Sequence, residues 1–176
     1  MKLSLVVPCY NEARTLVHLV ENVDEALIQS SLSLDAFELI LVDNGSKDAS
    51  GQIMQALERQ FAFVRVVQVA VNQGYGYGIQ QGLLAAHGEC LAVTHADMQT
   101  NPKDVFKAYD IYRSFIERTP DACPLLVKGV RRGRPWRMTV FSRFLDFIAL
   151  CLLRQIFYEI NAQPKVFNRK LLSALT

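Results

Sequence analysis

The sequence predicts an α/β protein in which helices cover both faces of a mostly parallel sheet, giving three α/β/α layers. Short apolar runs alternate four times with segments whose apolar residues recur at helical spacing. The 176 residues, of which 51% are hydrophobic and 20% charged, fit one compact domain with a sizeable core. Polar residues follow each apolar run, and open α/β sheets bind ligands at the carboxyl ends of their strands.

The apolar runs and the periodic segments place the individual elements. Strands are expected at residues 3–7, where Pro8 ends the run, at 37–42 and 64–69, and from Cys90 onward. Helices are expected at 15–30, from a cap at Asp48 or Ser50 to residue 60, at 79–87 before a stop at Gly88, and at 103–117. The remaining chain predicts a strand at 125–130, a long apolar helix at 139–158, an irregular or extended segment at 161–167 and a helix at 168–175.

Charge and cysteine content narrow the class of protein. The net charge of +2 gives no argument for nucleic-acid binding. The four cysteines are far apart and form no CxxC pair, so we expect free thiols and a reducing compartment. Residues 1–7 are too short for a signal peptide, and the apolar run 144–153 is too short for a membrane span. These features predict a cytoplasmic protein, either soluble or peripheral on the cytoplasmic face of a membrane.

The four strand ends carry most of the residues with chemical potential. Carboxylates follow three of them, at Glu12, Asp43 and Asp97, and a glycine-rich segment, residues 72–78, follows the other. These ends lie side by side on one edge of a parallel sheet, so we expect a single polar site there. Asp97, flanked by His95 and Gln99, is the expected anchor of a metal–diphosphate site, because a divalent cation offsets diphosphate charge.

Four short segments carry a family resemblance: residues 5–12 (LVVPCYNE), 41–48 (LVDNGSKD), 72–76 (NQGYG) and 95–102 (HADMQTNP). In order and spacing they resemble the motifs of family 2 glycosyltransferases of the GT-A fold, and most of all the polyprenyl-phosphate sugar transferases of the dolichyl-phosphate mannose synthase type. The resemblance implies one Rossmann-like GT-A domain over residues 1–176. Its nucleotide-sugar-binding part would cover about 1–102 and its acceptor-binding part about 103–176.

The resemblance also implies an activity and the residues that perform it. The activity would be inverting transfer of a hexose from a nucleotide diphosphate sugar, of the UDP-glucose or GDP-mannose type, to a polyprenyl phosphate. A divalent metal, Mn²⁺ or Mg²⁺, would be held by Asp97, Gln99 and His95. The implied catalytic residues are Asp97, Arg131 and Arg143, and the implied acceptor residues are Arg131, Ser142, Arg143, Gln163 and Lys165. The implied donor residues are Pro8, Tyr10, Glu12, Asp43, Asn44, Asn72, Gly74, Gly76 and Ala96.

One position departs from the family pattern. His95 stands where the family usually has the first Asp of a D-x-D motif. An imidazole suits manganese or zinc better than magnesium, so His95 is either a ligand of such a metal or a direct contact of the donor. A further alternative is a nucleotide-sugar-binding module without turnover.

The nature of the acceptor follows from the basic residues. Lys128, Arg131, Arg132, Arg134, Arg137 and Arg143 form a basic cluster of the kind that attracts phosphates or anionic lipid. A phosphate nucleophile is already ionised and needs only positioning and charge compensation, which arginine supplies. A saccharide or other hydroxyl acceptor would need a carboxylate base, and no carboxylate after residue 102 lies in a catalytic motif. The 139–158 helix, apolar almost all round, either packs in the core or lies against lipid. Since family members usually continue further, the chain is either a minimal form or part of a longer protein.

Overall fold

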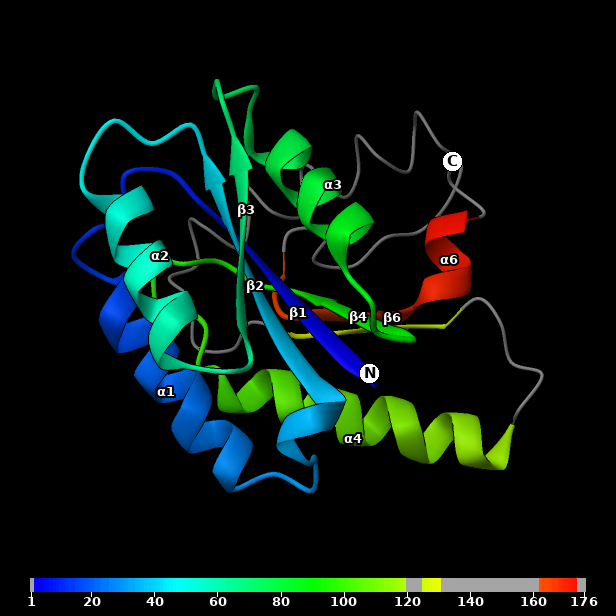
Figure 1. Ribbon diagram of the computed structural model, residues 1–176. Helices are drawn as coiled ribbons and strands as arrows, with labels where there is room; N and C mark the ends of the chain where they lie inside the picture. Colours follow the sequence, from blue (N-terminus) through cyan, green and yellow to red (C-terminus); the bar gives the residue numbers. More distant parts are fainter. Residues whose placement is uncertain (1, 120–124, 131–161, 174–176) are drawn as a thin grey trace, which may run out of the picture.

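A computed structural model describes residues 2–119, 125–130 and 162–173 of the chain. Strands and helices alternate through the first part, and a strand pair and a short helix follow (Figure 1). The elements are β1 (Leu3–Cys9), α1 (Leu16–Ile28), the 3₁₀ turn η1 (Leu34–Ala36), β2 (Phe37–Asn44), α2 (Ser50–Gln60), β3 (Val64–Val69), α3 (Tyr75–Ala85), β4 (Cys90–Val93), α4 (Lys103–Arg118), β5 (Leu126–Lys128), β6 (Lys165–Asn168) and α6 (Arg169–Ser173).

These strands form one six-stranded sheet in the order β3-β2-β1-β4-β6-β5. β1 pairs in parallel with β2 and β4, and β2 pairs in parallel with β3. β6 runs antiparallel between β4 and β5. This arrangement confirms the predicted α/β class and the mostly parallel sheet, which requires a helical crossover between successive parallel strands.

Helices cover both faces of the sheet and bury its strands. Every residue of β1 is buried, as expected for a central strand of a doubly covered parallel sheet. On one face, Leu5 and Val7 pack in a core shared with α1, α2 and α4. On the other face, Val6 packs in a smaller core shared with Leu83 of α3. Figure 1 shows α3 on the side of the sheet away from α1, α2 and α4.

The first predicted boundary that was wrong is the end of β1. The strand continues through Pro8 to Cys9, with Pro8 in register with Val42 of β2. The carbonyl of Val6 accepts a hydrogen bond from Thr94, so Val6 and Pro8 both direct their backbone polar groups toward β4. The β1–β4 pairing ends at Val6, so the missing N–H of Pro8 costs no ladder bond.

The second correction concerns α3, which was expected to begin at residue 79. It begins at Tyr75, so Gly76 and Gly78 lie in its first turn rather than in a loop. A Cβ at Gly78 would lie 3.2 Å from Cγ of Asn44 and 3.3 Å from Cβ of Pro8. The glycine therefore lets α3 pack closely on the ends of β1 and β2. The helix ends at Ala85, two residues before the predicted boundary.

The structure also tests the predictions for the last strands, the cap of α2 and the cysteines. The predicted strand at 125–130 is confirmed as the shorter β5, and the segment expected to be irregular or extended contains β6. Asp48 accepts a hydrogen bond from the Ser50 backbone N–H, but α2 has Ala49 at its N-cap position. Cys9 and Cys90 are free thiols, as expected. The 139–158 helix and Cys123 and Cys151 lie outside the described residues. In the part of the chain that is described, no helix is long and apolar enough to cross a bilayer.

A buried carboxylate connects β1, β2, β3 and the segment after α3 by hydrogen bonds at the edge of the sheet opposite the polar strand ends. Glu38 of β2 is 1% exposed, and its Oε1 accepts hydrogen bonds from the Ser4 hydroxyl (2.5 Å) and the His87 backbone N–H (2.6 Å). Its Oε2 accepts one from Arg65 (2.6 Å). Burial alone would raise the pKa of Glu38, but the bonds from Ser4, His87 and Arg65 together lower it below its ordinary value of 4.5. The folded protein therefore favours the ionised carboxylate.

We predict that Glu38 makes stability depend on pH under acidic conditions. A carboxyl group whose pKa is lowered by folding stabilises the fold above its unfolded pKa, and this contribution is lost as the pH falls through the folded value. The free energy of unfolding, measured by urea denaturation, should therefore decline more steeply below about pH 4.5 in the parent protein than in Glu38→Gln. Equal slopes in the two proteins would contradict this assignment. Glu38→Ala should cost about 3 kcal/mol at neutral pH, because it leaves buried donors unpaired.

Candidate active site

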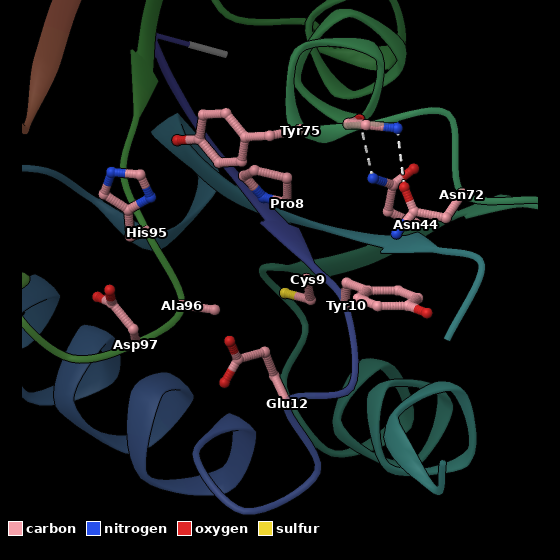
Figure 2. A pocket seen from close by; sticks show the side chains of 11 residues that line it. Pro8, Cys9, Tyr10, Glu12, Asn44, Asn72, Tyr75, His95, Ala96 and Asp97 are labelled. Atoms are coloured by element: carbon pink, nitrogen blue, oxygen red, sulfur yellow. Dashed lines mark hydrogen bonds between the residues drawn. The ribbon is translucent and has the colours of Figure 1, made fainter. Parts of the chain in front are cut away.

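A cavity of about 360 Å³ opens at the carboxyl edge of the sheet, beside the start of α3 (Figure 2). Its wall comes from the ends of β1, β2 and β4 and from the segment that leads into α3. Residues from four separate parts of the chain therefore meet at the switch point between parallel strands, where α/β sheets bind ligands. The lining residues are Pro8, Cys9, Tyr10, Glu12, Asn44, Asn72, Gly74, Tyr75, His95, Ala96 and Asp97.

Hydrogen bonds from the loop after β1 to the loop after β2 and to the first residue of α2 hold the Glu12 side of the cavity. The backbone N–H of Asn11, which has φ 56, donates to Oγ of Ser46 (3.2 Å). The backbone N–H of Glu12 donates to Oγ of the buried Ser50 (2.8 Å). The hydroxyl of Thr15 donates to Oε2 of Glu12 (2.9 Å). These bonds fix the position of a carboxylate on the cavity wall.

Asparagines position the start of α3. Gly74 is its N-cap residue, with φ 96, a conformation that favours glycine. Its backbone N–H donates to Oδ1 of Asn72 (2.8 Å), and its carbonyl accepts from Nδ2 of Asn44 (3.0 Å). Oδ1 of Asn44 is buried and has no hydrogen-bond partner among the described residues. Asn44 thus retains an acceptor at the cavity wall, beside a helix N-terminus that favours anions.

The turn after β4 supplies an imidazole and a carboxylate. The ring of Tyr75 stacks on His95, with centroids 5.1 Å apart and planes at 26°. Burial, with Asp97 nearby, raises the pKa of Tyr75 to about 12, so its hydroxyl stays protonated. Asp97 is exposed, and its Oδ1 accepts a hydrogen bond from the backbone N–H of Gln99 (3.1 Å). Figure 2 shows Tyr75 beside His95, and below them Asp97 and Glu12 with Ala96 between the two carboxylates.

Residues 4–172 match the model of glycosyl transferase family 2. The chain belongs to this family. It is 36% identical over 106 residues to dodecaprenyl-phosphate galacturonate synthase of Rhizobium johnstonii, covering 60% of the chain and 30% of that protein. It is 32% identical over 176 residues to undecaprenyl-phosphate 4-deoxy-4-formamido-L-arabinose transferase of Pseudomonas aeruginosa, covering 98% of the chain and 48% of that protein. The chain thus spans less than half the length of either relative.

Solved structures share the fold of this family 2 chain. Glucosyl-3-phosphoglycerate synthase of Mycobacterium tuberculosis, in complex with Mn²⁺, uridine diphosphate and glucosyl-3-phosphoglycerate, has a TM-score of 0.66 and 21% identity. That match covers 98% of the chain and 58% of the synthase. The mannosyltransferase PcManGT of Pyrobaculum calidifontis, in complex with GDP-mannose and Mn²⁺, has the same TM-score and identity, over 99% of the chain and 46% of that protein. The likeness confirms the predicted GT-A fold.

The cavity brings together most of the residues that the family 2 motifs predict for the donor. Asp43 and Gly76 do not line it, and neither does the predicted ligand Gln99. Oδ1 of Asp43 accepts a hydrogen bond from the Ser46 backbone N–H (2.9 Å), within the loop that leads to α2. The predicted residues that do line the cavity are Pro8, Tyr10, Glu12, Asn44, Asn72, Gly74, His95, Ala96 and Asp97.

Two lining residues were missed by the sequence argument. Cys9 lies between two predicted residues, and a strand that continued past Pro8 would have placed it at the cavity. Burial, with Glu12 and Asp43 nearby, raises the pKa of its thiol. Tyr75 was predicted to lie in a loop, and only the earlier helix start brings its ring to His95.

The predicted acceptor residues divide between described and undescribed parts of the chain. Arg131, Ser142 and Arg143 lie outside the described residues. Gln163 and Lys165 are described, and Lys165 pairs in register with Val93, two residues before His95. The predicted acceptor segment therefore reaches the carboxyl end of β4, where the cavity opens.

The side chains at the cavity fit a cation that shares a diphosphate ligand. In the described ranges, no three His, Cys, Asp or Glu side chains come together as an all-protein metal site. Asp97 offers an exposed carboxylate, with His95 and Glu12 in the same cavity. Mg²⁺ and Mn²⁺ at phosphate substrates commonly use one or two carboxylates, with phosphate oxygens and water as the other ligands. This donor set suits such a site.

We predict that the hydroxyl of Ser50 stabilises the Glu12 loop. Ser50→Ala leaves the backbone N–H of Glu12 without its acceptor in a part-buried setting, which should lower the free energy of unfolding by about 1–3 kcal/mol. Ser46→Ala is the matched control, because it removes the acceptor of an exposed N–H that water can satisfy, and it should cost less than about 0.5 kcal/mol. Urea denaturation followed by circular dichroism measures both. A cost for Ser50→Ala no larger than that of the control would disprove the role.

Proposed function

We propose that this chain forms the donor- and acceptor-binding domain of an inverting glycosyltransferase that transfers a hexose from a nucleotide diphosphate sugar, of the UDP-glucose or GDP-mannose type, to a polyprenyl phosphate. One observation carries the proposal: the family 2 motif residues converge on one cavity that contains Glu12, Asp97 and the start of α3. The names of the two relatives, both of which specify a polyprenyl phosphate, support the acceptor class.

The donor would bind with its nucleoside between β1 and β2 and its diphosphate between α3 and the β4 turn. Pro8 and Tyr10 would form the wall for the nucleoside, and Asn44 would accept a hydrogen bond from base or ribose. The N-terminus of α3, where Gly74 leaves room for close backbone approach, would favour the diphosphate. Asp97, with His95 and Gln99, would hold Mn²⁺ or Mg²⁺, and such a cation offsets the negative charge that develops on the leaving diphosphate.

The acceptor would attack from the side of residues 103–176. A phosphate oxygen of the polyprenyl phosphate forms the bond to the anomeric carbon, and the bond from that carbon to the diphosphate oxygen breaks. The electron pair leaves with the diphosphate, and the configuration inverts. The acceptor phosphate is already ionised at neutral pH, so no protein base is required. Arg131, Ser142, Arg143, Gln163 and Lys165 would orient it, and the domain would work at the cytoplasmic face of a membrane.

A second candidate function is nucleotide-sugar binding without turnover. The observation that favours it is His95, which replaces a carboxylate at the cavity and is stacked under Tyr75. Because position 95 carries an imidazole, Asp97 is the one carboxylate that the turn after β4 offers to a metal at the cavity.

We predict that Asp97 is required for transfer. A thermal-shift panel of UDP- and GDP-sugars with Mn²⁺ or Mg²⁺ should identify the donor, and a short prenyl phosphate should then accept the sugar. Asp97→Asn should reduce turnover by about 100-fold or more, because the cation loses its charged ligand. Asp35→Asn, at an exposed position in the turn before β2, should leave turnover unchanged. Donor binding without transfer to any acceptor would support the second candidate function, nucleotide-sugar binding without turnover. Transfer to sugars and not to the prenyl phosphate would show that the acceptor is a saccharide.

We predict that His95 sets the metal preference. In the parent protein, Mn²⁺ should support donor binding better than Mg²⁺, because imidazole is a better ligand for manganese. His95→Ala should narrow this preference by about tenfold, and His95→Asp should shift it toward Mg²⁺. Donor affinity measured with each metal gives the comparison. An unchanged ratio of the two affinities in His95→Ala would show that the imidazole is not a ligand.

A further inference from the structure

Two lysines face each other beside the cavity, on the strands that extend the sheet past β4. Lys128 of β5 is in register with Lys165 of β6, and Lys165 is in register with Val93 of β4. Side chains directly opposite each other on paired antiparallel strands lie on the same face of the sheet. The pair therefore lies near the carboxyl end of β4, since Val93 is only two residues before His95. Figure 1 shows β6 alongside β4.

The alternation of side chains identifies the face on which this pair lies. Val166 packs in the core that contains α1 and α4, whereas Phe167 packs in the core that contains Leu83 of α3. Lys165 is two residues from Phe167 on the same strand, so it shares the α3 face. The ring of Tyr75 at the cavity also comes from α3. The lysine pair thus lies at the same edge of the sheet as the cavity, on the face from which Tyr75 enters the cavity.

The charges of this pair are uncompensated within the described residues. Both lysines are half-buried, and no described carboxylate forms an ion pair with either of them. Burial, and then the charge of Lys128, lowers the pKa of Lys165. Like charges directly opposite on paired strands destabilise a sheet. An anion bound between them would remove this cost.

The backbone around the pair is held in place. The N–H of Gly129 donates to the carbonyl of Pro164 (2.9 Å), and a Cβ at Gly129 would collide with the carbonyl of Gln163. This close approach fixes the residue after Lys128 against the residues before Lys165. Oε1 of Gln163 is buried and has no hydrogen-bond partner among the described residues, so it can accept a hydrogen bond from a ligand hydroxyl. The backbone next to both lysines is therefore fixed, and a buried acceptor lies two residues before Lys165.

We propose that Lys128 and Lys165 form an oxyanion site next to the donor cavity. Its ligand is a phosphate or carboxylate group, held between two ammonium groups. Two sources could supply this group: the phosphate of the lipid acceptor, or a carboxylate on the transferred sugar. Which of these two groups occupies the site depends on the proposed transferase function. The binding of an oxyanion as such does not depend on that function, because it can be measured without a nucleotide.

The test compares Lys128→Gln, Lys165→Gln and the double variant with the parent protein. Lys107→Gln is the control, an exposed lysine of α4 that pairs with Asp104. One arm titrates a short prenyl phosphate without nucleotide, and the other compares UDP-glucuronate with UDP-glucose in the presence of Mn²⁺. Each single variant should lose about tenfold in affinity for the occupant and less than twofold for UDP-glucose. Without ligand, the single variants should melt at a higher temperature than the parent, because the repulsion is gone.

The outcomes separate the sources and the two proposals. A loss confined to prenyl phosphate assigns the site to the acceptor, and a loss confined to UDP-glucuronate assigns it to a sugar carboxylate. If the parent protein binds no nucleotide but its prenyl phosphate affinity depends on the lysines, the oxyanion site stands and the transferase function fails. If the parent binds neither anion, or if the lysine variants bind like Lys107→Gln, the oxyanion site is wrong.

Discussion

The parallel pairing of β1 with β2 and with β4 determines where the candidate residues that follow these three strands lie. In the order β2-β1-β4, all three strands end at the same edge, so the residues that follow them meet there. The β1–β2 pairing continues to Cys9 and Asp43, while the β1–β4 pairing stops at Val6 and Val93. Because the pairing with β4 ends earlier, the strands diverge at this edge and leave room for a cavity.

The close approach of α3 completes that cavity. Gly78 has no Cβ, so α3 packs directly on the ends of β1 and β2, and Asn44 bonds the backbone at its start. This brings the helix N-terminus and Tyr75 to the site from the face opposite α1 and α2. At the other end of the sheet, Glu38 binds the segment after α3 through the backbone of His87. Hydrogen bonds to Asn44 and Glu38 of β2 thus hold α3 and the residues beside it at both ends.

Charge is divided across β4. On the β1 side, Glu12 and Asp97 offer carboxylates, which suit a cation. On the β6 side, Lys128 and Lys165 offer ammonium groups, which suit an anion. A transfer between two phosphorylated substrates requires charge compensation on both the leaving and the attacking group. The proposed oxyanion site therefore complements the proposed cation site on the other side of the same strand.

The amino-acid sequence alone predicted the fold class, the order of the strands and α-helices from β1 to β5, and most of the cavity lining. Strand runs and helical periodicity depend on local patterns, and the motif residues had to meet because parallel strands end at one edge. The strand that pairs with the segment around Lys165 is known only from the folded structure. Strand pairing between distant segments depends on contacts that no local pattern encodes, so neither its antiparallel place beside β4 nor its register with Lys128 could be predicted. The start of α3 was decided in the same way, because packing against β1 and β2 and the bonds at Gly74 outweigh the low helix propensity of a glycine-rich segment.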